Sequence, residues 1–183
     1  ENHIYKGNPD VINMLNTKYI INRQGQLIQN PDAMGNAWFV NNIKIVPDAD
    51  TEIASLNGFD VKNTAIVDKR FSDQIINNIN NSNTSIILDV YKPNYLKYSY
   101  SSSTDGVVIF SEIYYDNGWN AYVDGELKKH FRANYVLRGM IVPSGIHNIE
   151  FKFEPTTYQT GERISLLCSL TLFLFLGFVF FKE

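Results

Sequence analysis

The sequence holds a single cysteine, Cys168, and this scarcity excludes two kinds of stabilisation. No internal disulfide can form, and no zinc site built from several cysteines is possible. Positive charge is also in short supply, because 16 Lys and Arg stand against 19 Asp and Glu, for a net charge of -3. Nucleic-acid binding needs a basic face, so the composition argues against a nucleic-acid partner.

Several catalytic and binding signatures are missing as well. The chain shows no local Ser-His-Asp signature, no phosphate-cradling glycine loop and no His/Asp/Glu cluster with the spacing of metal ligands. We therefore predict no catalytic residue, no cofactor and no metal site within it. The chain opens on Glu1 rather than Met and carries no signal-peptide pattern at its start, so we expect a piece of a longer protein.

One long hydrophobic run stands out, at residues 164–181 (ISLLCSLTLFLFLGFVFF). Eighteen helical residues at about 1.5 Å each reach roughly 27 Å, close to the hydrocarbon thickness of a bilayer. A buried core helix is the alternative, but a core helix of this length usually has a polar stripe, which this run lacks. Arg163 and Lys182 flank the run, so the positive-inside rule does not orient it. We predict a transmembrane helix at residues 164–181 that contacts the lipid bilayer.

The first part of the chain mixes helix and strand signals. Asn8 followed by Pro9 is typical of a helix start, and that helix is expected to run to about Asn16. A second short helix is expected at residues 49–56, before Asn57-Gly58. Strands are predicted at residues 18–22, at 37–46 as one or two strands, and at 64–67. A loop at residues 77–84 (NNINNSNT) ends this part.

After that loop, strand signals follow one another at short intervals. Asp124-Gly125 predicts a type I′ hairpin turn, and residues 147–153 alternate strictly between apolar and polar. Strands are predicted at residues 85–91, 95–101, 107–114, 121–123, 127–131, 135–142 and 147–153. The expected fold is mainly β (α+β): an antiparallel β-sandwich-like domain at residues 84–161, a small mixed α/β part at residues 1–76, and the transmembrane helix.

A few side chains are candidates for binding. The indole of Trp119 can stack on a sugar ring, although a Trp is more often a packing residue. A basic stretch can attract anionic lipid headgroups or a lipid phosphate, although a solvated charged face is the more common explanation. The candidate ligand or lipid contacts are Trp119, Lys128, Lys129, Arg132 and Arg138.

Two other features have plainer explanations. Asp124 and Glu126 resemble a carboxylate pair, but turn geometry explains Asp124 better. His147 falls on the apolar face of its strand, where a hydrogen-bonded structural role is more usual than that of a ligand or base.

Several distinctive strings occur in a fixed order along most of the chain. They are residues 15–20 (LNTKYI), 35–40 (GNAWFV), 114–125 (YYDNGWNAYVDG), 131–135 (FRANY), 137–139 (LRG), 142–147 (VPSGIH) and 149–153 (IEFKF). This order resembles the C-terminal region of the YfhO-like family of bacterial multispanning membrane proteins.

The resemblance implies a parent protein related to GT-C glycosyltransferases, which use lipid-phosphate-linked sugars to modify cell-envelope polymers. It implies that residues 1–163 lie outside the bacterial cytoplasmic membrane and that the catalytic carboxylate lies elsewhere in the parent. The chain itself is then non-catalytic. Its expected partners are the other membrane spans of the parent, and a lipid-phosphate sugar or an envelope glycan. The alternatives are a membrane-anchored carbohydrate-binding module and a protein-interaction β-module.

Overall fold

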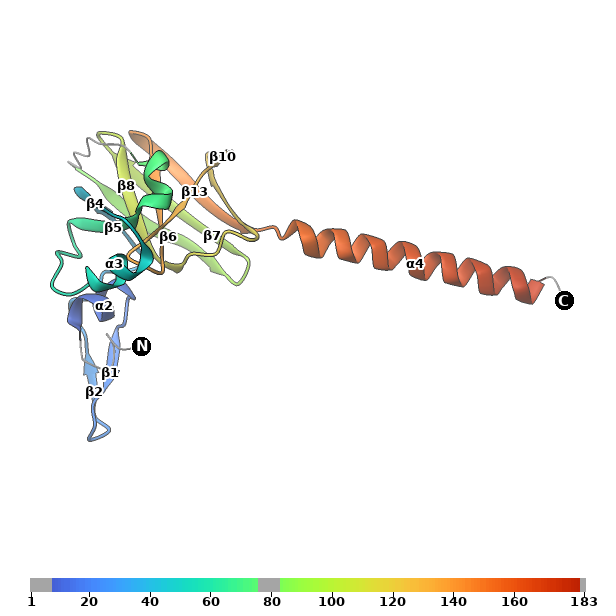
Figure 1. The fold of residues 1–183 in the computed structure, drawn as a ribbon, viewed down its shortest axis with the longest axis horizontal. Helices are drawn as coiled ribbons and strands as arrows, with labels where there is room; N and C mark the ends of the chain where they lie inside the picture. The colour runs from blue at the N-terminus through green and yellow to red at the C-terminus, as the bar shows by residue number, and fades with distance from the viewer. Residues whose placement is uncertain (1–7, 76–82, 182–183) are drawn as a thin grey trace.

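Two antiparallel β-sheets form the body of the protein. The computed structural model describes residues 8–75 and 83–181 (Figure 1). The larger sheet has the strand order β10-β9-β13-β7-β6 and the smaller sheet the order β11-β12-β8-β3. The larger sheet is built from β6 (Ser85–Lys92), β7 (Tyr95–Ser102), β9 (Trp119–Val123), β10 (Glu126–Lys128) and β13 (Gly145–Phe153). The smaller sheet is built from β3 (Ala37–Val40), β8 (Gly106–Ile113), β11 (Phe131–Ala133) and β12 (Leu137–Val142).

The two sheets pack face to face as a sandwich, and apolar residues from both sheets form the core between them. Every second residue of β7 is buried, which is the period expected of a strand with one face in a core. The Tyr98 ring meets the rings of Phe110 and Phe151 edge-on, with centroids 5.0 and 6.2 Å away. These aromatic contacts fill the space between the sheets.

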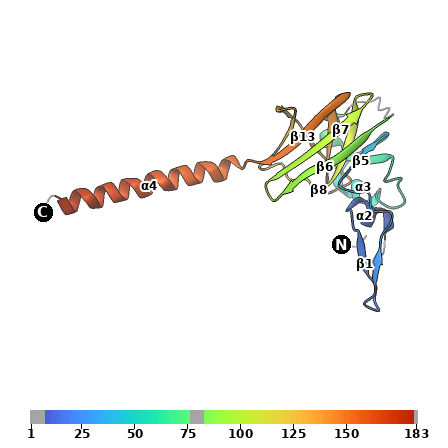
Figure 2. The same ribbon diagram turned by 180° about the vertical axis from the view of Figure 1, so that it is seen from behind.

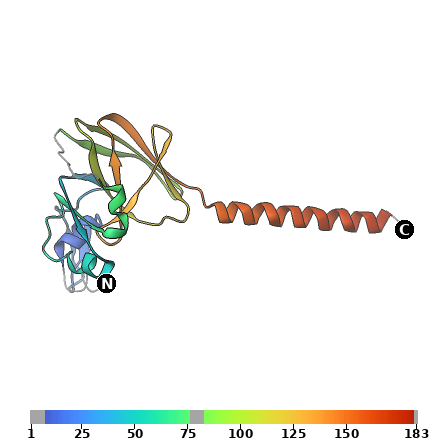
Figure 3. The same cartoon turned by 45° about the horizontal axis from the view of Figure 1, so that its top comes forward.

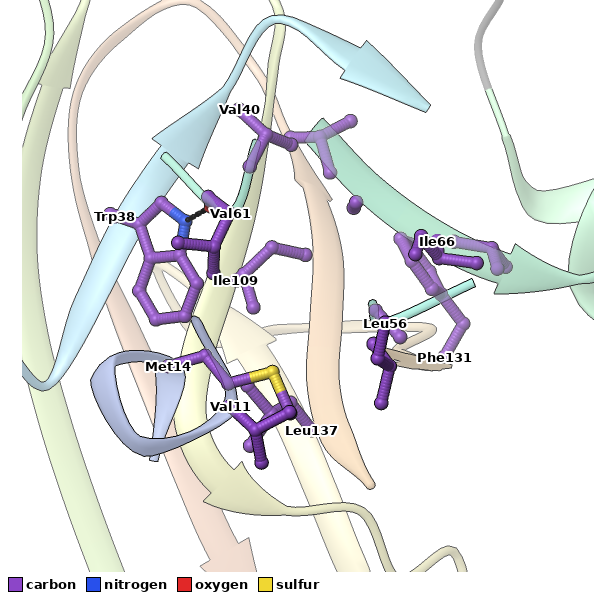
Figure 4. Packing of buried hydrophobic residues seen from close by; sticks show 14 of the residues in the cluster. Val11, Met14, Trp38, Val40, Leu56, Val61, Ile66, Ile109, Phe131 and Leu137 are labelled. Carbon is purple, nitrogen blue, oxygen red and sulfur yellow. Dashed lines mark hydrogen bonds between the residues drawn. The ribbon is translucent and has the colours of Figure 1, made fainter. Parts of the chain in front are cut away.

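A second core lies on the other face of the smaller sheet, where the N-terminal part packs against it (Figure 4). The N-terminal part contributes α2 (Pro9–Met14), α3 (Ala49–Ala54), the parallel pair β4 (Asn42–Val46) and β5 (Thr64–Asp68), and the 3-10 helix η1 (Lys69–Gln74). In this core the indole Nε1 of Trp38 donates to the carbonyl of Val61 over 3.1 Å. The molecule therefore has three layers, with the smaller sheet in the middle.

The helix starts follow the expected capping chemistry. The Asn8 side chain accepts hydrogen bonds from the N–H groups of Asp10 and Val11, and Pro9 occupies the first helical position. The Asp48 side chain caps α3 in the same way, by accepting from the N–H of Thr51. The predicted helix start at Asn8 and Pro9 is confirmed.

A short hairpin projects from the N-terminal part. It consists of β1 (Tyr19–Ile21) and β2 (Leu27–Gln29), and all six of these residues are exposed (Figures 1 and 2). The strand β1 lies within the predicted range 18–22, whereas β2 was not predicted. The sequence of β2 is too short to show a clear alternation.

Helix α4 (Thr156–Phe181) extends away from the sandwich without packing on it (Figures 1 and 3). It begins before the predicted range 164–181, and its apolar side chains are exposed around its circumference. A helix that is apolar on all sides and has no protein around it matches a membrane span in length and composition.

The fold class is confirmed, because the structure is mainly antiparallel β with a small α/β part and one apolar C-terminal helix. Residues 37–46 form two strands, β3 and β4, that belong to different sheets. The predicted strand at 127–131 is likewise divided, because the chain crosses from β10 in one sheet to β11 in the other. The loop predicted at residues 77–84 lies mostly outside the described residues. The predicted division into an α/β part that ends at residue 76 and a sandwich part that begins at residue 84 stays a prediction. Strand β3 of the first part pairs with β8 of the second.

Candidate functional site

The hairpin of β9 and β10 is closed by the two-residue turn Asp124-Gly125. Their φ angles are 49° and 86°, and Val123 pairs with Glu126 across the turn. Two positive φ values in a two-residue loop are typical of a type I′ turn, so the predicted turn is confirmed. The hairpin lies on the side of the sandwich from which α4 departs (Figures 1 and 3).

The Asp124 carboxylate fastens this turn to the neighbouring strand β13. It accepts a hydrogen bond from the N–H of Asn148 over 2.9 Å and contacts Nδ1 of His147 at 2.5 Å. These contacts lower the pKa of the Asp124 carboxyl and raise the pKa of the His147 imidazole. Glu126 points elsewhere and pairs with Lys128. The two carboxylates therefore do not act as a pair, and both Asp124 and His147 have structural partners.

A cavity of about 490 Å³ lies beside the hairpin. Trp119, Lys128 and Lys129 line it, together with Tyr114 and His130. A smaller cavity of about 280 Å³ shares both lysines and continues the depression toward Phe131 and Ile141. The larger volume is within the range of small-molecule sites. The structure thus brings three of the five candidate contact residues together at one depression, which we call the hairpin cavity.

Trp119 is half-buried and has both packing and cavity contacts. Its ring lies 5.4 Å from that of Phe153, and the guanidinium of Arg138 stands 4.3 Å from its centroid. Its backbone carbonyl accepts a hydrogen bond from Nε2 of His130 over 2.9 Å. Because a carbonyl only accepts, Nε2 carries the proton, and burial lowers the pKa of this imidazole. The indole is thus held firmly at the cavity wall.

Arg138 lies inside the sandwich rather than on its surface. It is 2% exposed, and its Nε donates to the carbonyl of Ile113 over 3.0 Å. Its guanidinium is placed over the rings of Trp119 and Phe151, and burial lowers its pKa. Arg138 supports the Trp119 ring from within the core and does not line the hairpin cavity.

Arg132 is directed toward the N-terminal layer. Its Nη2 pairs with the fully buried Glu52 over 2.6 Å and lies 3.5 Å from the carboxylate of Asp68. The other oxygen of Glu52 accepts from the N–H of Tyr135. Burial raises the pKa of Glu52, whereas hydrogen bonds from Arg70 lower that of Asp68. This network joins α3, β5 and β11. The basic stretch of the sequence therefore divides into two exposed lysines, the half-buried Arg132 and the buried Arg138.

Residues other than the predicted contacts also shape this end of the molecule. Tyr114 and His130 line the hairpin cavity, and Asp116 and Asn120 join it to a neighbouring cavity at the start of α4. Sequence patterns alone did not single these residues out as contacts. The available signal was the unusual string at residues 114–125, which supplies three of these four residues and carries much of the family resemblance.

Comparisons with known proteins agree with this architecture. The family model described as "Bacterial membrane protein YfhO" matches residues 11–165, which is most of the chain. No curated protein matches, and no solved structure matches. The matched region runs from α2 through both sheets and into α4. The chain therefore belongs to the YfhO family of bacterial membrane proteins.

Proposed function

We propose that this chain is a non-catalytic extracytoplasmic domain of a polytopic membrane protein of the GT-C glycosyltransferase type, with α4 as a membrane span. The hairpin cavity carries this proposal, because an aromatic ring and two lysines line it, and Trp119 pairs with Phe153, three residues before α4 begins at Thr156. In the proposed topology the cavity lies near the membrane surface, where a lipid-phosphate-linked sugar is presented.

The proposed role is to cap the active-site cavity of the parent and to hold the donor sugar or the envelope glycan. Trp119 supplies a ring for stacking on a sugar, and Lys128 and Lys129 supply positive charge for a phosphate. Arg138 keeps Trp119 in place, and Arg132 holds β11 against the N-terminal layer. In this proposal residues 1–163 lie outside the bacterial cytoplasmic membrane and the C-terminus lies at the cytoplasm.

Sugar transfer by the full-length parent tests this role. Trp119→Ala and the double variant Lys128→Gln/Lys129→Gln are expected to lower transfer from a lipid-phosphate sugar by roughly tenfold, which is the effect of losing one strong contact. Lys62→Gln/Lys97→Gln is the matched control, since both of these lysines are outside the hairpin cavity. Unchanged transfer in the cavity variants would contradict the proposal, as would turnover by residues 1–183 alone that depends on a carboxylate.

A membrane-anchored binding module is the second candidate, and the β1–β2 hairpin favours it. Exposed side chains of this hairpin include Tyr19 and Ile21, at 58% and 72%. An isolated two-stranded hairpin is marginally stable in water, so a covering partner would stabilise it. If this candidate is correct, deleting residues 19–29 abolishes capture of an envelope glycan or protein while the catalytic rate of the parent is unchanged.

A further inference from the structure

A second cavity opens next to the hairpin cavity, where the sandwich meets α4, and the two cavities share Asp116 and Asn120. Its volume is about 700 Å³, and it is formed by the β8–β9 loop, the end of β13 and the first turn of α4. We call it the junction cavity. Its side chains combine aromatic rings, amides and carboxylates: Tyr115, Asp116, Asn117, Asn120, Glu154 and Tyr158.

Local backbone geometry builds this cavity. Gly118 has a φ of +128°, and a Cβ at this position would lie 2.8 Å from Cε2 of Phe153 and 3.2 Å from Cβ of Pro155. The N–H of Glu154 also donates to the carbonyl of Gly118. Glycine thus lets the β8–β9 loop lie directly against the exit of β13, and the two segments form the wall of the junction cavity.

The Glu154 carboxylate is held in one orientation. Its Oε2 accepts from the hydroxyl of Tyr122 over 2.7 Å and from Nδ2 of Asn120 over 2.9 Å. Within the described residues, nothing donates a hydrogen bond to Oε1 of Glu154 or to the carboxylate of Asp116. A preoriented carboxylate with a free oxygen is well suited to accept hydrogen bonds from a ligand.

The lining chemistry selects between possible ligands. Two carboxylates line the cavity, and no Lys, Arg or His is among its lining residues in the described part of the chain. The nearby Lys152 is engaged with Glu150 at 2.8 Å and with the ring of Tyr122. A phosphate would therefore be repelled. A group with several hydroxyl donors and an apolar ring face would instead find acceptors in Asp116 and Glu154 and stacking partners in Tyr115 and Tyr158.

The position of the cavity relative to the bilayer narrows the choice further. Helix α4 starts at Thr156, whereas its uncharged run starts at Ile164. At about 1.5 Å per residue, the cavity lies roughly 12 Å above the hydrocarbon core, at or just beyond the headgroup layer. A lipid headgroup reaches this height only when it extends well past the glycerol backbone, as a sugar headgroup does.

We propose that the junction cavity binds the uncharged sugar headgroup of a membrane glycolipid. The site adjoins the hairpin cavity and shares Asp116 and Asn120 with it, and this assignment holds whether or not the parent transfers sugar. The headgroup hydroxyls donate to Asp116 and Glu154, and the exposed rings of Tyr115 and Tyr158 cover its apolar face.

Lipid competition on the full chain tests this proposal. The chain is reconstituted in nanodiscs that contain diglucosyl-diacylglycerol and phosphatidylglycerol at equal mole fractions, and native mass spectrometry measures which lipid stays bound. The wild type is expected to retain the glycolipid preferentially. Asp116→Asn and Tyr115→Ala are each expected to lower that preference, by about tenfold for the lost charged acceptor. The Asp116 carboxylate has no hydrogen-bond partner in the described protein, and Tyr115 lines the junction cavity but not the hairpin cavity, so the two variants together test this site.

Matched controls separate the site from general effects of the substitutions. Asp32→Asn and Tyr91→Ala change exposed residues of the same types outside the cavity and should leave the preference intact. Circular dichroism melts confirm that each variant is folded. Equal retention of the two lipids by the wild type would overturn the proposal, and so would a preference for phosphatidylglycerol. Displacement of the glycolipid by an equal concentration of free maltose would overturn the assignment to a lipid.

Discussion

At the scale of single residues, the Asp124-Gly125 turn gives a direct test of backbone strain. Gly125 has a φ of +86°, a conformation in which a β-branched side chain clashes with its own backbone. Gly125→Val is therefore expected to destabilise the domain by about 1–3 kcal/mol, whereas Asp124→Asn keeps a residue suited to this turn. Urea unfolding of the two variants measures the difference. A Gly125→Val protein as stable as the wild type would contradict the turn geometry.

The contact between Asp124 and His147 adds a pH dependence to this turn. Hydrogen bonding to Asp124 raises the pKa of His147, so the stabilisation is complete below the unfolded pKa of about 6.5 and is lost as pH rises through the folded pKa. The pKa of Asp124 is lowered, so its contribution is lost only when pH falls through that lowered value. The contact should stabilise most between about pH 4 and 6.5.

The measurement is the loss of stability that His147→Gln causes, determined at pH values within and above this range. The contribution of His130 to stability changes with pH in the opposite direction. Burial lowers the pKa of its imidazole, so this contribution is lost as pH falls. Comparing His147→Gln with the wild type at each pH cancels the His130 effect. The loss is expected to be larger at about pH 6 than at about pH 9. A loss that does not change with pH would show that the contact is not an ion pair.

At the scale of elements, a buried charge network joins the N-terminal layer to the sandwich. Arg132 of β11 meets Glu52 of α3 and Asp68 of β5, and the side chains of both acids are at most 1% exposed. Asn134 adds a second link, since its side chain accepts from the N–H of Ile66 and its own N–H donates to the Ile66 carbonyl. The string at residues 131–135 that supports the family resemblance therefore forms a structural joint.

Removing one partner from this network is expected to be costly. Arg132→Leu leaves Glu52 buried without its cation and should lower the free energy of unfolding by about 3–5 kcal/mol. Arg70→Leu removes a cation whose side chain is 63% exposed, and it should cost less, because Asp68 keeps Arg132 at 3.5 Å and the backbone N–H of residue 70. Chemical denaturation compares the two variants. The double variant Arg132→Leu/Glu52→Gln should recover part of the lost stability. Equal losses of stability for Arg132→Leu and Arg70→Leu would contradict a role for burial.

At the scale of the whole molecule, the sandwich and α4 should behave as separate physical bodies. The sandwich has its own two cores. The apolar side chains of α4 are exposed along its length, and its stretch that is long enough to cross a membrane is not buried in the protein. A chain that ends at Gly161 is therefore expected to be soluble without detergent, and the full chain to partition into membranes. Purification of the full chain as an ordinary soluble monomer would contradict a membrane span at residues 164–181.

Part of this architecture was predictable from neighbouring residues alone. The Asn8-Pro9 helix start, the Asp124-Gly125 turn and the uncharged run of α4 each depend on local dihedral preference or on local hydrophobicity. Sequence reasoning therefore reached the fold class and the hairpin beside the candidate site. It could not separate residues 37–40 from residues 42–46, which enter different sheets, because strand pairing depends on partners far along the chain.

Only the tertiary structure decided which of the basic side chains are exposed at the hairpin cavity. Lys128, Lys129, Arg132 and Arg138 are close in sequence, yet only the two lysines line the hairpin cavity. Arg132 pairs with Glu52, which lies 80 positions earlier in the sequence. Arg138 is covered by rings from β9 and β13. A charged side chain is buried only where distant residues supply its counter-charge or its packing. The sequence by itself determined most of the strand segments, the turn and the apolar helix, whereas long-range packing determined the strand pairing and which charges remain available at the surface.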